Sequence, residues 1–109
     1  MHELAIAESV VSQVLERTHD RHVSVVRLRV GRLAGVVPDA LEFCFELAAG
    51  GTPLAGASLE IVEASGVARC RSCDADFELV DPILLCDCGS ADVELVSGRE
   101  LQVTSVEVG

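Results

Sequence analysis

Hydrophobic residues in the first segment recur every three or four positions, which is the spacing of one face of a helix. The residues on this face are Leu4, Ile6, Ala7, Val10, Val11, Val14 and Leu15. Glu3 stands where the helix dipole favours an acid, although no residue before it supplies the usual side-chain cap. The pattern predicts a helix that ends at Thr18–Asp20.

A second helix is predicted between a proline and a pair of glycines. Pro38 suits the first helical position, because its fixed φ is preorganised and its missing N–H needs no partner there. Gly50–Gly51 predict the end of the helix. We expect Cys44, which lies on the hydrophobic face, to be buried and chemically inert, with a fifth metal ligand or a reactive thiol as the alternative. The hydrophobic face consists of Leu41, Cys44, Phe45 and Ala48.

Three segments show the period-two alternation that is typical of a half-buried strand. The first covers Ser24–Gly31 and the second covers Ser58–Ala64. Their hydrophobic faces consist of Val26, Leu28 and Val30 in the first strand and of Leu59 and Ile61 in the second.

The third strand, Glu100–Val108, changes phase along its length. Hydrophobic residues up to Val103 occupy odd positions, whereas those from Val106 onward occupy even positions. A bulge near Ser105 would insert one residue and bring both groups to the same face.

Composition and charge narrow the possible functions. The chain has 109 residues, half of them hydrophobic, which suits one domain with a small satellite and excludes a disordered chain. Its formal net charge of −10 argues against binding to nucleic acid or to an anionic membrane. No apolar run approaches the roughly 20 residues that span a bilayer. The start, MHELAIAESVV, lacks the cationic region of a secretory signal, and we therefore expect a cytoplasmic protein.

Four of the five cysteines lie in the acidic residues 67–96, between the second and third strands. They form two pairs, Cys70-x-x-Cys73 and Cys86-x-Cys88. A reducing compartment disfavours disulfides, so metal binding or redox chemistry is the better interpretation. Two such pairs, brought together by a short hairpin, complete the tetrahedral site that is typical of zinc.

Four thiolates leave no open coordination position, so this Zn(II) would be structural rather than catalytic. Its binding free energy would stabilise a segment too small to fold alone. We therefore interpret residues 67–96 as a zinc-binding module inserted into a main domain of residues 1–66 and 97–109. The second pair has one residue fewer than the usual spacing, although alternate side chains of an extended backbone still point the same way. A redox-active cysteine pair and unliganded thiols are the two alternatives.

The first three residues offer a second, different set of metal ligands. The amine of Met1, the amide and imidazole of His2 and the amide of Glu3 supply four nitrogen donors. Four such donors in a plane suit Ni(II) or Cu(II) better than zinc. A histidine at this position is by itself a weak signal. His19 and His22 flank the turn after the first helix, where we expect solvated side chains, with an auxiliary metal contact as the alternative.

Over its whole length the chain resembles the HypA/HybF family of hydrogenase nickel-incorporation proteins. The resemblance rests on the opening MHELAIAESVV, the central VGRLAGVVPDALEFCFELAAGGT, the CRSC pair and the closing CGSADVELVSGRELQVTSVEV. Its specific motifs are Met-His-Glu at the start, Gly-x-Leu-x-Gly-Val-x-Pro-x-x-Leu in the middle and Ser-Gly-Arg-Glu-Leu near the end.

The resemblance implies an α+β fold in which two helices pack on a sheet of residues 23–31, 58–65 and 100–108. A zinc-ribbon-like module is inserted before the last strand. It also implies a nickel metallochaperone rather than an enzyme, with a nickel-handling GTPase and the large-subunit precursor of [NiFe]-hydrogenase as partners. Some members of the family also serve urease maturation. The implied ligands are Met1, His2 and Glu3 for the Ni(II) cargo and Cys70, Cys73, Cys86 and Cys88 for zinc.

Three other classes of protein remain as rivals. An enzyme with catalytic zinc needs an open metal position, and four cysteines leave none. A zinc-ribbon nucleic-acid module needs basic or stacking residues. A redox sensor would eject zinc as its thiols form disulfides. Against the nucleic-acid module, the inserted segment carries Asp74, Asp76, Glu78, Asp81 and Asp87.

Overall fold

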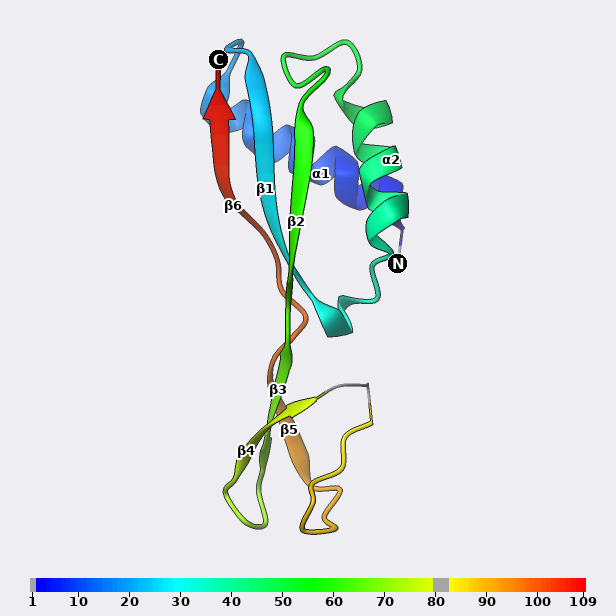
Figure 1. Cartoon of the computed structure of the whole chain (residues 1–109), viewed down its shortest axis with the longest axis vertical. Coiled ribbons are helices and arrows are strands. Elements are labelled where there is room, and N and C mark those ends of the chain that lie inside the picture. Colours follow the sequence, from blue (N-terminus) through cyan, green and yellow to red (C-terminus); the bar gives the residue numbers. More distant parts are fainter. Residues whose placement is uncertain (1, 80–82) are drawn as a thin grey trace.

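The computed structural model describes residues 2–79 and 83–109 (Figure 1). These residues form an α+β fold, as the sequence predicts. In chain order the elements are α1 (Glu3–Thr18), β1 (Val23–Gly31), the 3₁₀ turn η1 (Arg32–Ala34), α2 (Pro38–Ala49), β2 (Ser58–Ala64), β3 (Gly66–Cys70), β4 (Asp76–Leu79), β5 (Val93–Ser97) and β6 (Leu101–Val108).

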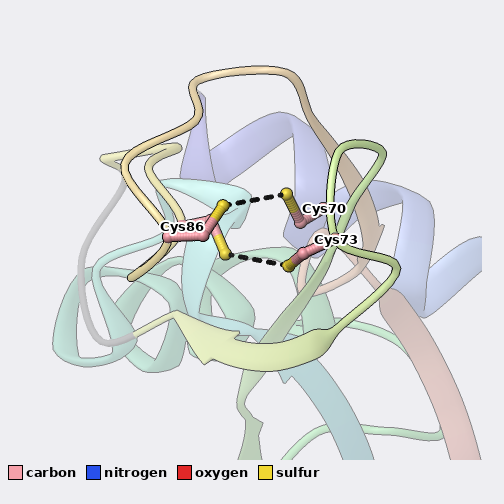
Figure 2. A group of neighbouring side chains, drawn as sticks. Cys70, Cys73 and Cys86 are labelled. Carbon is pink, nitrogen blue, oxygen red and sulfur yellow. Dashed lines mark hydrogen bonds between the residues drawn. The ribbon is translucent and has the colours of Figure 1, made fainter.

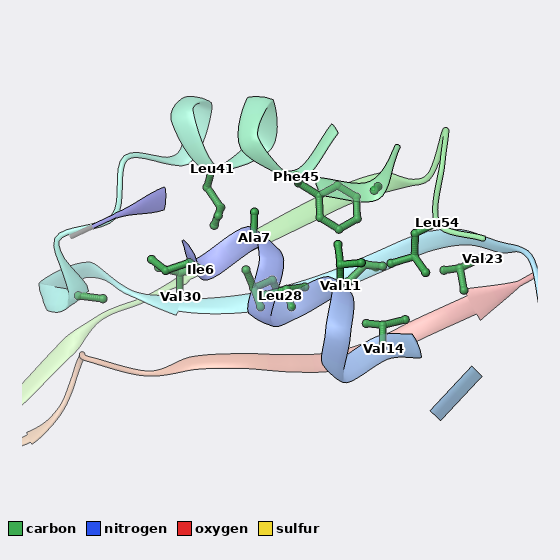
Figure 3. Close-up of a cluster of buried hydrophobic side chains, with 14 residues drawn as sticks. Ile6, Ala7, Val11, Val14, Val23, Leu28, Val30, Leu41, Phe45 and Leu54 are labelled. Atoms are coloured by element: carbon green, nitrogen blue, oxygen red, sulfur yellow. The ribbon is translucent and has the colours of Figure 1, made fainter. Parts of the chain in front are cut away.

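The larger part of the molecule combines the two helices with a three-stranded sheet, and we call it the helical lobe. Its strand order is β2-β1-β6, with β1 parallel to β2 and antiparallel to β6. The central strand alternates as predicted, because Val26, Leu28 and Val30 are buried while Arg29 is exposed. Figure 3 shows side chains of α1, α2 and β1 converging on one core, which has Phe45 as its largest buried side chain.

The helix boundaries agree closely with the sequence pattern. Helix α1 ends at Thr18 and has no side-chain cap at its start, and α2 begins at Pro38 and ends one residue before Gly50. One expectation about burial is wrong, because Cys44 is only half-buried at the border of the core. Leu4, at the edge of the predicted hydrophobic face of α1, is 42% exposed.

The predicted bulge in the last strand is confirmed. Ser105 pairs with Arg27 and Val103 pairs with Leu28, so Thr104 is the extra residue in β6. This one residue restores the phase of the strand, and both Val103 and Val106 pack against the core of the helical lobe.

The inserted segment contains more regular structure than the short hairpin that the sequence suggests. Strands β3, β4 and β5 form an antiparallel sheet in the order β4-β3-β5, and we call this sheet with the four cysteines the cysteine lobe. Strands of four or five residues are too short for the alternation to be distinctive. The small core of this lobe consists of Ala68, Cys70, Leu79, Cys86 and Val93.

The two lobes lie end to end (Figure 1). The molecule measures 52 × 21 × 17 Å, and its radius of gyration of 17.0 Å exceeds the about 13 Å of a compact domain of this length. Among the residues that the structure describes, no helix is long and apolar enough to cross a membrane.

Candidate metal centre

The four cysteines predicted to bind zinc meet at the far end of the cysteine lobe. The Sγ atoms of Cys70 and Cys88 are 3.7 Å apart, as are those of Cys73 and Cys86, and all four lie within 4.8 Å of one another. The dashed lines in Figure 2 mark the two shorter separations. A tetrahedron with zinc–sulfur bonds of about 2.3 Å has edges of about 3.8 Å. The four sulfurs therefore fit a structural zinc ion.

The first pair is held by a turn that follows β3. The N–H of Cys70 donates to the carbonyl of Ala75 at 2.9 Å, and the N–H of Asp74 donates back to the carbonyl of Cys70 at 2.9 Å. Asp74 adopts a φ of 60°, a left-handed conformation that Asp tolerates better than most residues. This turn directs the side chains of Cys70 and Cys73 to the same side.

The second pair uses the same arrangement in a turn that is one residue shorter. The N–H of Cys86 donates to the carbonyl of Ser90 at 3.0 Å, and the N–H of Gly89 donates to the carbonyl of Cys86 at 2.9 Å. Gly89 has a φ of 92°, so it takes the left-handed position that Asp74 occupies in the first turn. The shorter spacing therefore still brings the sulfur of Cys88 to the site.

Polar contacts join the two turns independently of any metal. The hydroxyls of Ser72 and Ser90 are 2.9 Å apart. The guanidinium of Arg71 donates to the carboxylates of Asp92 at 3.0 Å and Glu94 at 3.3 Å. Sequence reasoning missed these residues. The one signal for Arg71 is that it is the single basic residue in an otherwise acidic stretch from 70 to 96.

The surroundings of the four sulfurs give the cysteines different pKa values. The backbone N–H of Cys73, together with that of Ser72, lowers the pKa of Cys70 to about 6. The N–H of Cys88 lowers the pKa of Cys86, but burial and the neighbouring thiols outweigh it and raise this pKa to about 12. Four adjacent sulfurs therefore do not all ionise at neutral pH by themselves. A divalent cation would displace the remaining protons, so metal binding at this site releases protons.

The predicted nickel ligands lie at the start of α1, and Met1 falls outside the described residues. His2 is exposed and has an extended backbone, with φ −88° and ψ 102°. The first hydrogen bond of the helix runs from the N–H of Ile6 to the carbonyl of His2, at 3.1 Å. The amides of His2 and Glu3 therefore precede the ladder of helical hydrogen bonds.

The carboxylate of Glu3 fixes the start of α1 against the start of α2. It accepts the backbone N–H of Val37 at 3.2 Å, and this contact, with the N–H of Glu3 itself, lowers the pKa of Glu3. His19 and His22 are exposed. Within residues 2–79 and 83–109, the four cysteines are the one group of three or more side chains that is placed to hold a metal ion.

Comparisons with known proteins test the family resemblance inferred from the sequence. A family described as hydrogenase/urease nickel incorporation, metallochaperone, hypA, matches residues 1–108. A hydrogenase maturation factor HypA from Trichormus variabilis is 44% identical over 108 residues, which cover 99% of this chain and 96% of that protein. A factor with the same name from Streptomyces avermitilis is 49% identical over 112 residues, covering 97% of this chain and 86% of that protein.

The fold also matches a solved structure. The solution structure of the Ni metallochaperone HypA from Helicobacter pylori aligns with a TM-score of 0.71 at 20% sequence identity, covering 99% of this chain and 97% of that chain. The resemblance inferred from the sequence is thus confirmed by the family match and by the curated relatives. The chain belongs to the HypA family of metallochaperones for nickel incorporation into hydrogenase and urease.

Proposed function

We propose that this protein, working in the cytoplasm, binds one Ni(II) ion at its first three residues and delivers it to the large-subunit precursor of a [NiFe]-hydrogenase. A nickel-handling GTPase takes part in the delivery, and urease maturation proteins are further recipients to test. In this proposal residues 67–96 hold a structural zinc, and residues 1–66 with 97–109 form the nickel-binding domain.

The exposed start of α1 is the observation that carries the nickel site. His2 is exposed and precedes the helix, and its amide and that of Glu3 lie ahead of the first helical hydrogen bond. These nitrogens can lose their protons and bind a metal without breaking the helical ladder. With the imidazole of His2 and the amine of Met1 they form the four-nitrogen set that favours planar Ni(II).

The separation of two ligand chemistries supports distinct roles for the two metals. Four thiolates enclose an ion completely and suit a permanent structural zinc. His2 is exposed, so an incoming ligand can approach a planar nickel ion from above or below its plane. A nickel ion that must be transferred to another protein is therefore better held at the first three residues than by the four cysteines.

A nickel titration of zinc-loaded protein with its native start tests the proposal. We expect one diamagnetic, square-planar Ni(II) per chain in the native protein, and its loss in His2→Ala and in a form extended before Met1. His22→Ala is the matched control, because it removes an exposed imidazole elsewhere. All variants should retain one zinc. Equal nickel binding by the native, His2→Ala and extended forms would refute the site.

A further inference from the structure

Two of the family motifs found in the sequence lie where the two lobes join (Figure 1). Neither motif contains a proposed metal ligand. One is the Gly-x-Leu-x-Gly motif at 31–35, which leaves β1, and the other is the Ser-Gly-Arg-Glu-Leu motif at 97–101, between β5 and β6. The chain passes between the lobes twice, once at Ser65 between β2 and β3 and once in the second motif.

The two motifs are in direct backbone contact. The N–H of Leu33 donates to the carbonyl of Gly98 at 2.7 Å, and the N–H of Gly31 donates to the carbonyl of Glu100 at 2.8 Å. A Cβ atom on Gly31 would lie 2.1 Å from the carbonyl oxygen of Gly98. One on Gly98 would lie 2.7 Å from the Cα of Gly66. Three segments can touch here because each has a glycine at the contact.

Leu33 fills the space beside these glycines. Its Cδ1 atom would lie 2.8 Å from a Cβ on Gly66 and 3.2 Å from one on Gly98. The side chain packs against the core of the cysteine lobe, whereas that of the next residue, Ala34, belongs to the core of the helical lobe. The short turn η1 thus places neighbouring side chains in both cores.

Glu100 adds a polar restraint to the same contact. Its carboxylate accepts the N–H of Gly98 and lies 3.6 Å from the guanidinium of Arg29 on β1. Gly98 has a φ of +125°, which side chains with a Cβ rarely adopt. The turn at Gly98 is therefore held by its neighbours on both sides of the junction.

We propose that Gly31, Gly66 and Gly98, with Leu33 packed between them, form a rigid joint that fixes the orientation of the cysteine lobe relative to the helical lobe. None of these four residues is a proposed nickel ligand. The consequence of the joint is that a partner contacting both lobes meets a surface already arranged for it, which lowers the entropic cost of association.

Residual dipolar couplings on the zinc-loaded full chain test the joint. We expect one alignment tensor to fit both lobes of the natural protein. Gly31→Ala should abolish that common fit, while the couplings within each lobe still agree with that lobe's structure. Alanine suits the backbone of Gly31, where φ is −68°, so the contact with Gly98 is the perturbation. Gly50→Ala is the matched control, because its φ is −57° and its nearest contact is 3.4 Å away.

A second variant keeps the proposal testable if the Gly31→Ala protein does not fold. Leu33→Ala removes the side chain between the glycines without creating a clash, and we expect it too to lose the common alignment tensor. The proposal is overturned if the natural protein needs a separate tensor for each lobe. It is also overturned if Leu33→Ala retains the common tensor of the natural protein. A failure of nickel binding would refute the proposed nickel site at His2 and would leave the test of the joint unaffected.

Discussion

Chelating the metal of the four-cysteine site should unfold the cysteine lobe and leave the helical lobe folded. Apart from the two buried ligands, the buried core of the cysteine lobe consists of Ala68, Leu79 and Val93. Burying a leucine or a valine contributes about 1.5–3 kcal/mol, so these two side chains together supply about 3–6 kcal/mol. Structural zinc in small modules contributes about 10–16 kcal/mol. A zinc ion bound by the four cysteines would therefore supply the larger share of the stability of this lobe.

Hydrogen exchange of backbone amides, measured before and after a chelator removes the zinc, separates the two lobes. Protection should collapse in β3, β4 and β5 and persist in β1, β2 and β6. Cys73→Ser should reproduce the effect without a chelator, whereas Cys44→Ser should not, because Cys44 lies in the helical lobe. Persistent protection of β3–β5 in protein shown by elemental analysis to be free of zinc would refute the reasoning.

Three further predictions concern the core, the carboxylates and the nickel site. Phe45→Ala should lower the free energy of unfolding by about 3–5 kcal/mol in a urea titration, because Phe45 is 1% exposed. Phe43→Ala, at a position 62% exposed, should change it by no more than about 0.5 kcal/mol. Backbone N–H groups lower the pKa values of the Glu3 and Glu100 carboxylates from the ordinary value of 4.5. The ionised carboxylates therefore contribute fully to the free energy of unfolding above pH 4.5, and this contribution is lost as the pH falls through their lower pKa values in the folded state. Urea midpoints measured across this range should fall less steeply in Glu3→Gln and Glu100→Gln than in the natural protein. Nickel should dissociate between about pH 7.5 and about pH 5.5, because protons compete with the metal for the imidazole of His2 and for the amide nitrogens of His2 and Glu3. An unchanged affinity in a pH-dependent titration would contradict the proposed ligands.

Local patterns were sufficient to predict most of the helical lobe. The period of 3.6 residues located both helices, and Pro38 and the glycines after Ala49 marked the limits of α2. The change of phase in the last strand predicted a bulge that the structure places at Thr104. These features depend on neighbours along the chain, so a single sequence contains the information that specifies them. The cysteine spacings likewise indicated a metal site, because the donor atoms themselves define that chemistry.

Tertiary structure decided how these parts meet. The pairing of Cys70 with Cys88 and of Cys73 with Cys86 depends on two turns that the sequence does not align with each other. The contact of Gly31 with Gly98 joins positions 67 residues apart, and a glycine in a motif does not say which backbone it will touch. Local periodicity records only which side of an element is apolar. Which other element packs against that apolar side depends on segments that are distant in the chain, and only the folded structure contains that information.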